Sequence, residues 1–148
     1  MAVKLLHDPD VRVSIEARLK KLSPDARAQW GKFSVDRMLW HINEAMLVTL
    51  GEAKLDPARL PVPGAVLRFA VLNLPWVKGA PTNPALIPAG QHDFEAERAR
   101  SLSLVARVTS KPVDDSWPRH PVFGAMSGRD VSRLHAKHLD HHLRQFGV

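Results

Sequence analysis

Four of the chain's eight histidines lie within fourteen residues near its C-terminus: His135, His138, His141 and His142. Imidazoles bind transition metals, titrate near neutral pH and pair with anions. The chain contains no cysteine, so thiolate metal sites, disulfides and a cysteine nucleophile are excluded. Any transition-metal site must therefore use His, Asp or Glu, a set of donors that suits zinc, nickel or iron.

The spacing of these histidines places them on one face of a helix. At about 100° per residue, His138 and His142 fall in the middle of the apolar stripe, and His135 lies on the same stripe one turn earlier. His141 falls at the edge of the stripe, and Asp140 lies opposite, where we expect it to be exposed to solvent. Two or three imidazoles therefore face the core, where each needs a polar partner.

A His-x-x-x-His pair supplies two ligands, whereas a zinc ion with an open position needs about three protein ligands and water. His41 lies on the apolar side of another predicted helix, and ligands from facing helices meet on the axis of a bundle. The predicted site is therefore His41, His138 and His142, with water completing it. In the alternative, the three imidazoles are hydrogen-bonded core residues. His135 stays open as a fourth ligand, as a group that hydrogen-bonds a ligand, or as a residue at the rim.

The elements that must position these side chains are helical. Capping residues and apolar periodicity predict long helices over residues 9–22, 35–54, 93–110 and 127–146, and a short one over residues 64–74. Seven of the twelve prolines lie between Pro57 and Pro88, which predicts a long irregular crossover around the short helix. The predicted fold is all-α: one four-helix-bundle domain over residues 1–148, with a proline-rich crossover between the second and third main helices.

Composition limits the classes of function. Hydrophobic residues make up 45% and charged residues 24%, which is typical of a globular protein. The net charge of +6 suggests a nucleic-acid partner, but acidic residues are interleaved with the basic ones, so we do not expect one. We expect no signal peptide and no membrane contact, because no apolar run approaches the ~20 residues of a membrane span. The predicted location is the cytoplasm. We expect His7, His92 and His120, in loops or at helix starts, to lie at the surface.

Three segments resemble the DinB/YfiT-like superfamily of predicted metal-dependent hydrolases. They are Trp30–Ala45 (WGKFSVDRMLWHINEA), His120–Gly124 (HPVFG) and Lys137–Gly147 (KHLDHHLRQFG). The last is characteristic of a branch of that superfamily known only as a domain of unknown function. The resemblance spans nearly the whole chain, from the first of these segments to the C-terminus.

The resemblance implies a four-helix bundle with a divalent metal, often zinc or nickel, held by one histidine of the second helix and a His-x-x-x-His pair of the last. Matched residue by residue, these are His41, His138 and His142. His141 matches a recurring histidine of the family that is not a ligand. The common family ending has Arg-Gly-Gln after the paired histidines, whereas Leu-Arg-Gln follows here. Some relatives are thiol-dependent transferases, so the resemblance implies a hydrolase or a thiol transferase acting on a small molecule.

In such a site the metal lowers the pKa of bound water toward ~7. His135 is then the candidate proton shuttle, and Glu44, one turn after His41, is a weaker candidate base or a solvated surface residue. Gln145 can hydrogen-bond a ligand or substrate, and we expect Trp76 of the crossover to pack on the bundle. The alternative function is a non-catalytic metal-binding or stress-related bundle protein, and a homodimer is compatible with such bundles.

Overall fold

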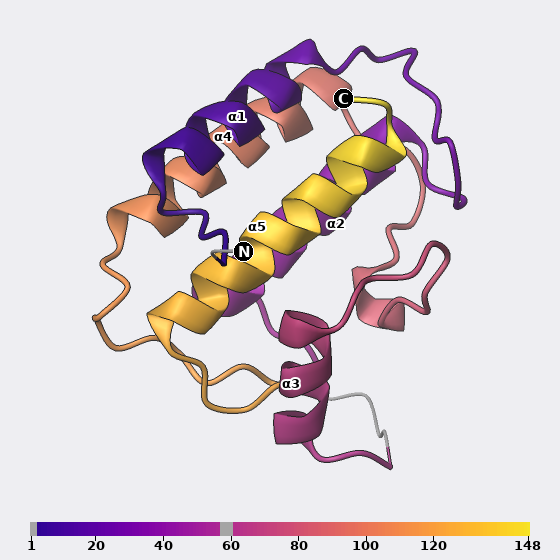
Figure 1. Ribbon diagram of the computed structural model, residues 1–148. Helices are drawn as coiled ribbons and strands as arrows, with labels where there is room; N and C mark the ends of the chain where they lie inside the picture. Colours follow the sequence, from indigo (N-terminus) through magenta and orange to yellow (C-terminus); the bar gives the residue numbers. More distant parts are fainter. Residues whose placement is uncertain (1–2, 57–60) are drawn as a thin grey trace.

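The computed structural model describes residues 3–56 and 61–148, and this part of the chain is helical (Figure 1). It contains α1 (Pro9–Lys21), α2 (Val35–Thr49), α3 (Gly64–Asn73), α4 (Phe94–Ser110) and α5 (Gly128–Gln145), with a short 3₁₀ turn η1 at Pro84–Leu86. No strand occurs within these two ranges, where the only β-type pairing is a single bridge between His120 and Gly124. The predicted all-α class is therefore confirmed.

Local capping explains most helix boundaries. Pro9 occupies the first turn of α1, the Asp93 side chain accepts from the Ala96 amide at the start of α4, and Ser127 and Asp130 form a reciprocal capping box on α5. The predicted end of α2 near residue 54 was wrong, since the helix stops at Thr49. Gly51, at φ 77°, turns the chain out of the helix in a conformation that glycine adopts without steric cost.

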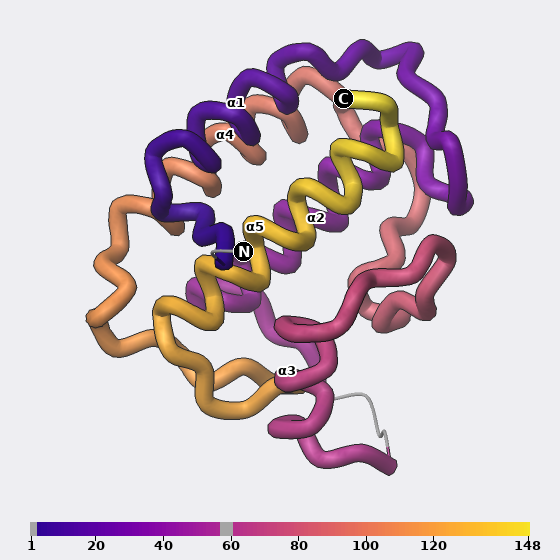
Figure 2. The backbone as a smooth tube through the Cα atoms, viewed as in Figure 1, coloured from indigo at the N-terminus to yellow at the C-terminus, as the bar shows by residue number. Residues whose placement is uncertain are grey.

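The four long helices pack in a ring in which α4 lies between α1 and α2, and α5 closes the ring on the other side (Figures 1 and 2). Side-chain contacts give the directions. Asp36 at the start of α2 accepts from the His92 amide just before α4, and Asn43 in the middle of α2 accepts from Ser101 in the middle of α4, so these two helices are parallel. His41 faces His138 while Thr49 faces His135, so α2 and α5 are antiparallel. The crossover thus returns the chain to the same end of the molecule before α4 begins.

The core lies inside this ring and is built from aliphatic side chains and methionines. Its fully buried members include Leu19 of α1, Met38, Leu39, Ile42 and Met46 of α2, Val105 and Val108 of α4, and Val131, Leu139 and Leu143 of α5. Each helix contributes positions three or four apart, the spacing that keeps one face of a helix turned inward. No described helix has the length and apolarity needed to cross a membrane.

The crossover is anchored to α5 from outside the ring. The ammonium group of Lys137 donates to three carbonyl oxygens at the end of α3, those of Val71 (2.9 Å), Leu72 (3.2 Å) and Leu74 (2.9 Å). A cation at the C-terminus of a helix satisfies its last carbonyls and complements the helix dipole. This contact holds the segment after α3 beside the middle of α5.

Candidate metal centre

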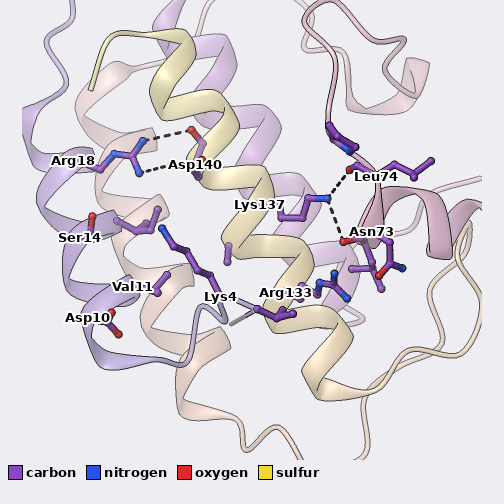
Figure 3. A pocket seen from close by; sticks show the side chains of 15 residues that line it. Lys4, Asp10, Val11, Ser14, Arg18, Asn73, Leu74, Arg133, Lys137 and Asp140 are labelled. Atoms are coloured by element: carbon purple, nitrogen blue, oxygen red, sulfur yellow. Dashed lines mark hydrogen bonds and ion pairs between the residues drawn. The ribbon is translucent and has the colours of Figure 1, made fainter. Parts of the chain in front are cut away.

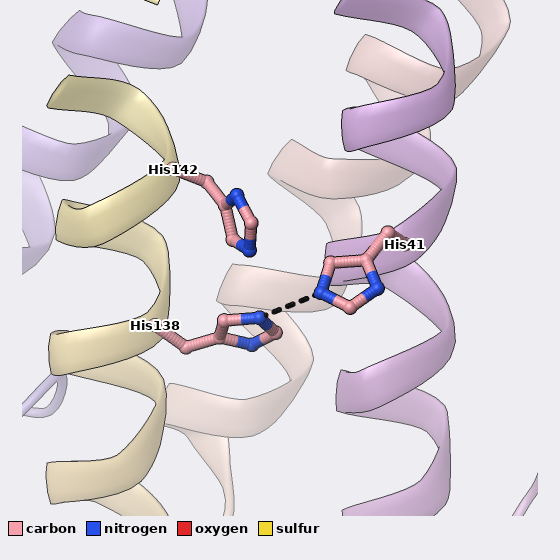
Figure 4. A group of neighbouring side chains, drawn as sticks. All are labelled: His41, His138 and His142. Carbon is pink, nitrogen blue, oxygen red and sulfur yellow. Dashed lines mark hydrogen bonds between the residues drawn. The ribbon is translucent and has the colours of Figure 1, made fainter. Parts of the chain in front are cut away.

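Three imidazoles from two antiparallel helices converge inside the molecule (Figure 4). His41 of α2 and His138 and His142 of α5 each offer one ring nitrogen, and the three nitrogens lie within 4.8 Å of one another. The ring centroids are 4.8–4.9 Å apart in all three pairs. For comparison, tetrahedral zinc with Zn–N distances of about 2.0 Å needs nitrogens roughly 3.3 Å apart. The observed nitrogens, 2.9 Å apart in the His41–His138 pair and within 4.8 Å in all three pairs, are close to that spacing.

Hydrogen bonds on the far side of two rings set their tautomers. Nδ1–H of His41 donates to the carbonyl oxygen of Leu86, at 2.8 Å, and Nδ1–H of His142 donates to Oε1 of Gln145, at 2.7 Å. The amide of Gln145 is oriented by its own bond from Nε2 to the carbonyl of Trp30, at 2.8 Å. A neutral imidazole that donates through Nδ1 carries a lone pair on Nε2. Both rings therefore turn a lone pair toward the cluster.

His138 completes the arrangement. Its Nε2 lies 2.9 Å from Nε2 of His41. Because the Nε2 of His41 is the acceptor in this pair, the proton of the metal-free form lies on the Nε2 of His138. Transfer of that shared proton to Nδ1 of His138 would leave the ring neutral and three lone pairs facing one another.

The cluster is kept neutral by burial. Exposed fractions are 4% for His41, 9% for His138 and 8% for His142. Burial lowers the pKa of His41 and holds the pKa of His138 well below its usual value, with neighbouring imidazoles adding to the effect. Burial and the proximity of His41 lower the pKa of His142 to about 3. At neutral pH all three rings are uncharged, the form in which imidazole binds a metal.

Aromatic side chains cover the cluster. Phe33, from the segment before α2, lies 5.3 Å from His41 and 6.3 Å from His142 between ring centroids. The indole ring of Trp76 lies 5.5 Å from the rings of both His138 and His141. Trp76 thus packs on α5, which agrees with the predicted packing on the bundle, and it lies directly against the proposed ligand His138.

His135 lies on α5 next to this cluster but is not one of its members. Its Nε2–H donates to Thr49 Oγ1 at 2.7 Å, and the Thr49 hydroxyl donates in turn to the carbonyl of Met46. The ring is 1% exposed, which excludes the alternative that placed it at the rim, and burial lowers its pKa to about 3. Its Nδ1 is buried and has no hydrogen-bond partner among the described residues.

The remaining candidates have partners of their own. The Glu44 carboxylate pairs with Arg100 of α4 at 2.6 Å, so it is neither free at the rim nor simply solvated. Asp140, expected to be solvent-exposed, is half-exposed and pairs with Arg18 at 2.9 Å and with Arg144 at 3.0 Å.

The prediction that His7, His92 and His120 lie at the surface was wrong for His120, and the other two are only partly exposed. His120 is 8% exposed, and its Nδ1 accepts from two backbone amides of the turn that follows it. His7 is half-buried and joins Ser132 to the carbonyl of Lys111. His92 stacks on Trp40, with ring centroids 5.5 Å apart. Loop residues were assigned to the surface because sequence spacing does not show which loops fold back onto helices.

Two contributors to the site could not be found by reasoning from side-chain types. The Leu86 carbonyl that orients His41 is a backbone group of the 3₁₀ turn in the crossover, and the Trp30 carbonyl that orients Gln145 lies before α2. Any residue presents a carbonyl, so the sequence carries no signal for either.

Two cavities lie away from the cluster. The larger, of about 830 Å³, is bounded by α1, α5 and the end of α3 (Figure 3). Its Arg18 pairs with Asp140, and its Lys137 is held by the carbonyls of the crossover. The smaller, of about 350 Å³, lies between the start of α3 and the turn at residues 120–124. Neither is lined by His41, His138 or His142.

Comparison with known proteins found one family. The family model described as "Protein of unknown function (DUF1569)" matches residues 9–147 of the chain. No curated protein and no solved structure matched it. The match includes all five helices and each of the three clustered histidines.

Proposed function

The chain belongs to the DUF1569 family of proteins of unknown function, and we propose that it is a metal-dependent enzyme that holds a divalent ion through His41, His138 and His142. Zinc is the best candidate, and nickel and iron suit the same donors. A small-molecule substrate and a hydrolytic or thiol-transfer reaction are the proposed chemistry.

The main support for the metal site is the pair of hydrogen bonds that orient the rings of His41 and His142 through their outer nitrogens. Metal-binding histidines almost always donate their other N–H to a carbonyl or carboxylate, which fixes the tautomer. His41 and His142 make such bonds, to Leu86 and Gln145. The inner nitrogens of the three rings lie within 4.8 Å of one another, and the one hydrogen bond among them, from Nε2–H of His138 to Nε2 of His41, is a bond that a metal ion can replace.

We also propose that the four long helices are a DinB/YfiT-like four-helix bundle forming a single domain. Three observations support this: the ring of α1, α4, α2 and α5, the long crossover between α2 and α4, and the placement of one ligand on the second helix and two on the last. Oppositely charged side chains are interleaved on the surface, in eight ion pairs among the described residues, which supports a small-molecule partner over nucleic acid.

A bound divalent ion would supply a water of lowered pKa, or would bind a thiolate. The chain itself would supply neutral ligands, a water-poor surrounding and proton transfer. His135 is the proposed shuttle because its Nδ1 lone pair is unpaired within the described structure and it lies one turn from His138. Glu44 suits this role less, since Arg100 holds its carboxylate.

A non-catalytic metal site is the second candidate, and the cover over the cluster favours it. The three imidazoles are less than a tenth exposed, and neither the cavity beside α1 nor the one beside the start of α3 reaches them. A structural metal is typically sealed in this way, whereas a catalytic metal keeps an open position.

The first test is the metal content of the protein purified without a histidine tag, measured by elemental analysis. We expect about one divalent ion per chain, lost in His41→Ala, His138→Ala and His142→Ala but retained in the control His92→Ala. Absence of metal after incubation with zinc, nickel and iron would end both the enzyme and the metal-site proposals. Retention of metal in any of the three site variants would remove that residue from the ligand set.

A further inference from the structure

The segment His120–Gly124 plays no part in the metal site, yet it forms a closely defined turn. The amide of His120 donates to the Gly124 carbonyl at 2.8 Å, and the Gly124 amide donates back at 2.9 Å. Gly124 has φ 72°, a conformation that residues with a Cβ rarely adopt. The turn is therefore held in one shape by its own backbone.

This turn packs against the first residue of α3. A Cβ added at Gly64 would lie 2.6 Å from the carbonyl oxygen of Val122, so only glycine allows this approach. Between the helix start and the turn lies the cavity of about 350 Å³. That volume is at the lower end of the ~300–1,000 Å³ range of small-molecule sites.

Backbone donors at the start of α3 are available to this cavity. The helix has no side-chain cap, and the amides of Gly64 and Ala65 have no acceptor among the residues described. Both residues line the cavity. The first amides of a helix, together with its dipole, favour an anion at this end.

Two guanidinium groups line the same cavity and no acidic residue does. Arg68 donates through one nitrogen, Nη1, to the carbonyls of Phe123 and Ala125, which leaves its other nitrogens available. Arg119 lies beside Gly124, with Nη2 3.4 Å from the place a Cβ would take there. Within the described ranges its side chain has neither a hydrogen bond nor an ion pair.

His120 adds a side-chain donor that is independent of the helix. Its Nδ1 accepts from the amides of Val122 (3.1 Å) and Phe123 (3.2 Å), so the proton of the neutral ring is on Nε2. The ring is 8% exposed and lines the cavity, and Nε2–H has no acceptor in the described structure. A side-chain donor at the wall of a cavity that has no acceptor among the described protein groups is available to a ligand.

From this convergence of donors we infer that the cavity binds the phosphate group of a small molecule, through the amides of Gly64 and Ala65, the guanidinium of Arg119 and the Nε2–H of His120. Planar guanidinium groups and helix amides are the groups that recognise phosphate oxygens most specifically. The cavity is larger than a bare phosphate ion and too small for a macromolecule. The site does not depend on the metal centre, because the two share no residue.

The test uses ¹H–¹⁵N NMR of the full chain titrated with inorganic phosphate and, separately, with glycerol 3-phosphate, at constant ionic strength set with chloride. We expect the amide signals of Gly64, Ala65 and Gly124 to shift and saturate, with tighter binding of glycerol 3-phosphate. Removal of one charge-assisted contact by Arg119→Gln weakens binding by about tenfold or more. Because Arg119 is exposed and unpaired in the described structure, this variant should fold normally.

Two further variants make the assignment specific. Ala65→Glu places a carboxylate at the start of α3 and should abolish phosphate binding without loss of helix. Arg133→Gln removes a guanidinium of the larger cavity and should leave the affinity unchanged. The proposal would be overturned if these three amide signals did not shift, or if chloride alone shifted them equally. It would also be overturned if Arg119→Gln bound phosphate as tightly as the unchanged protein, or if Arg133→Gln lost binding.

Discussion

At the scale of single residues, the site depends on which nitrogen of each imidazole carries the proton. His142 has its tautomer set by Gln145, whose own orientation is set by the Trp30 carbonyl. A change two contacts away from the inner nitrogen can therefore alter metal affinity without touching a ligand.

Gln145→Ala tests this chain of contacts. Loss of the Oε1 acceptor frees the His142 ring to turn and to place its proton on Nε2, so we expect metal affinity to fall about 10–100-fold. Competition with a chromophoric chelator measures the change. Arg144→Ala, at the adjacent exposed position, should bind metal normally, and equal affinity in both variants would mean that Gln145 does not position the ligand.

At the scale of elements, the crossover does more than connect α2 to α4. It carries the Leu86 carbonyl that orients His41 and the Trp76 ring that covers His138. Lys137 of α5 fixes the segment between α3 and Trp76 by its three carbonyl contacts. An irregular, proline-rich stretch thus determines both the geometry of the cluster and access to it.

Trp76→Ala tests whether the crossover controls access. An aromatic contact of this kind contributes roughly 0.5–1.5 kcal/mol, so we expect removal of metal by a chelator to become faster, by up to about tenfold. Stopped-flow measurement of metal release gives the rate. Val77→Ala, at a neighbouring residue that is 66% exposed, is the control. Unchanged release in Trp76→Ala would show that metal leaves by another route.

At the scale of the whole molecule, several histidines are buried in neutral form. Burial lowers the pKa of His120 to about 4 and that of His135 to about 3. In the unfolded chain both titrate near 6.5. Between these values the unfolded chain binds more protons than the folded protein, so the free energy of unfolding must fall as the pH is lowered from about 6.5 toward 4.

Urea unfolding of the metal-free protein between pH 7.5 and pH 4.5 measures this dependence. Each buried neutral histidine contributes a slope of up to about 1.4 kcal/mol per pH unit in that window. His120→Asn keeps an acceptor for the turn amides but cannot be protonated. We therefore expect the slope of its free energy of unfolding against pH to be smaller by the contribution of nearly one proton. An identical slope in the variant would mean that His120 is already protonated, or exposed, in the folded protein.

The sequence alone determined which residues could meet. The capping side chains of Asp93 and Ser127 act locally, and so do Pro9 in the first turn of α1 and the apolar repeats. This is why the helix starts near residues 9, 35, 93 and 127 and the inward face of α5 were predicted. The same periodicity selected His41, His138 and His142, because burial of a helix face depends mainly on spacing along that helix.

Tertiary structure alone decided the rest. Contacts between residues far apart in the sequence determine the parallel direction of α2 and α4 and the burial of His120. They also determine the hydrogen bond between His135 and Thr49 and the ion pair between Glu44 and Arg100. The backbone carbonyls of Leu86 and Trp30 cannot be recognised from the sequence, because every residue has one. The path of the crossover brings the first to His41, and the path of the segment before α2 brings the second to Gln145. Spacing along a helix sets which way a side chain points, whereas the partner it finds there is set by the packing of other elements.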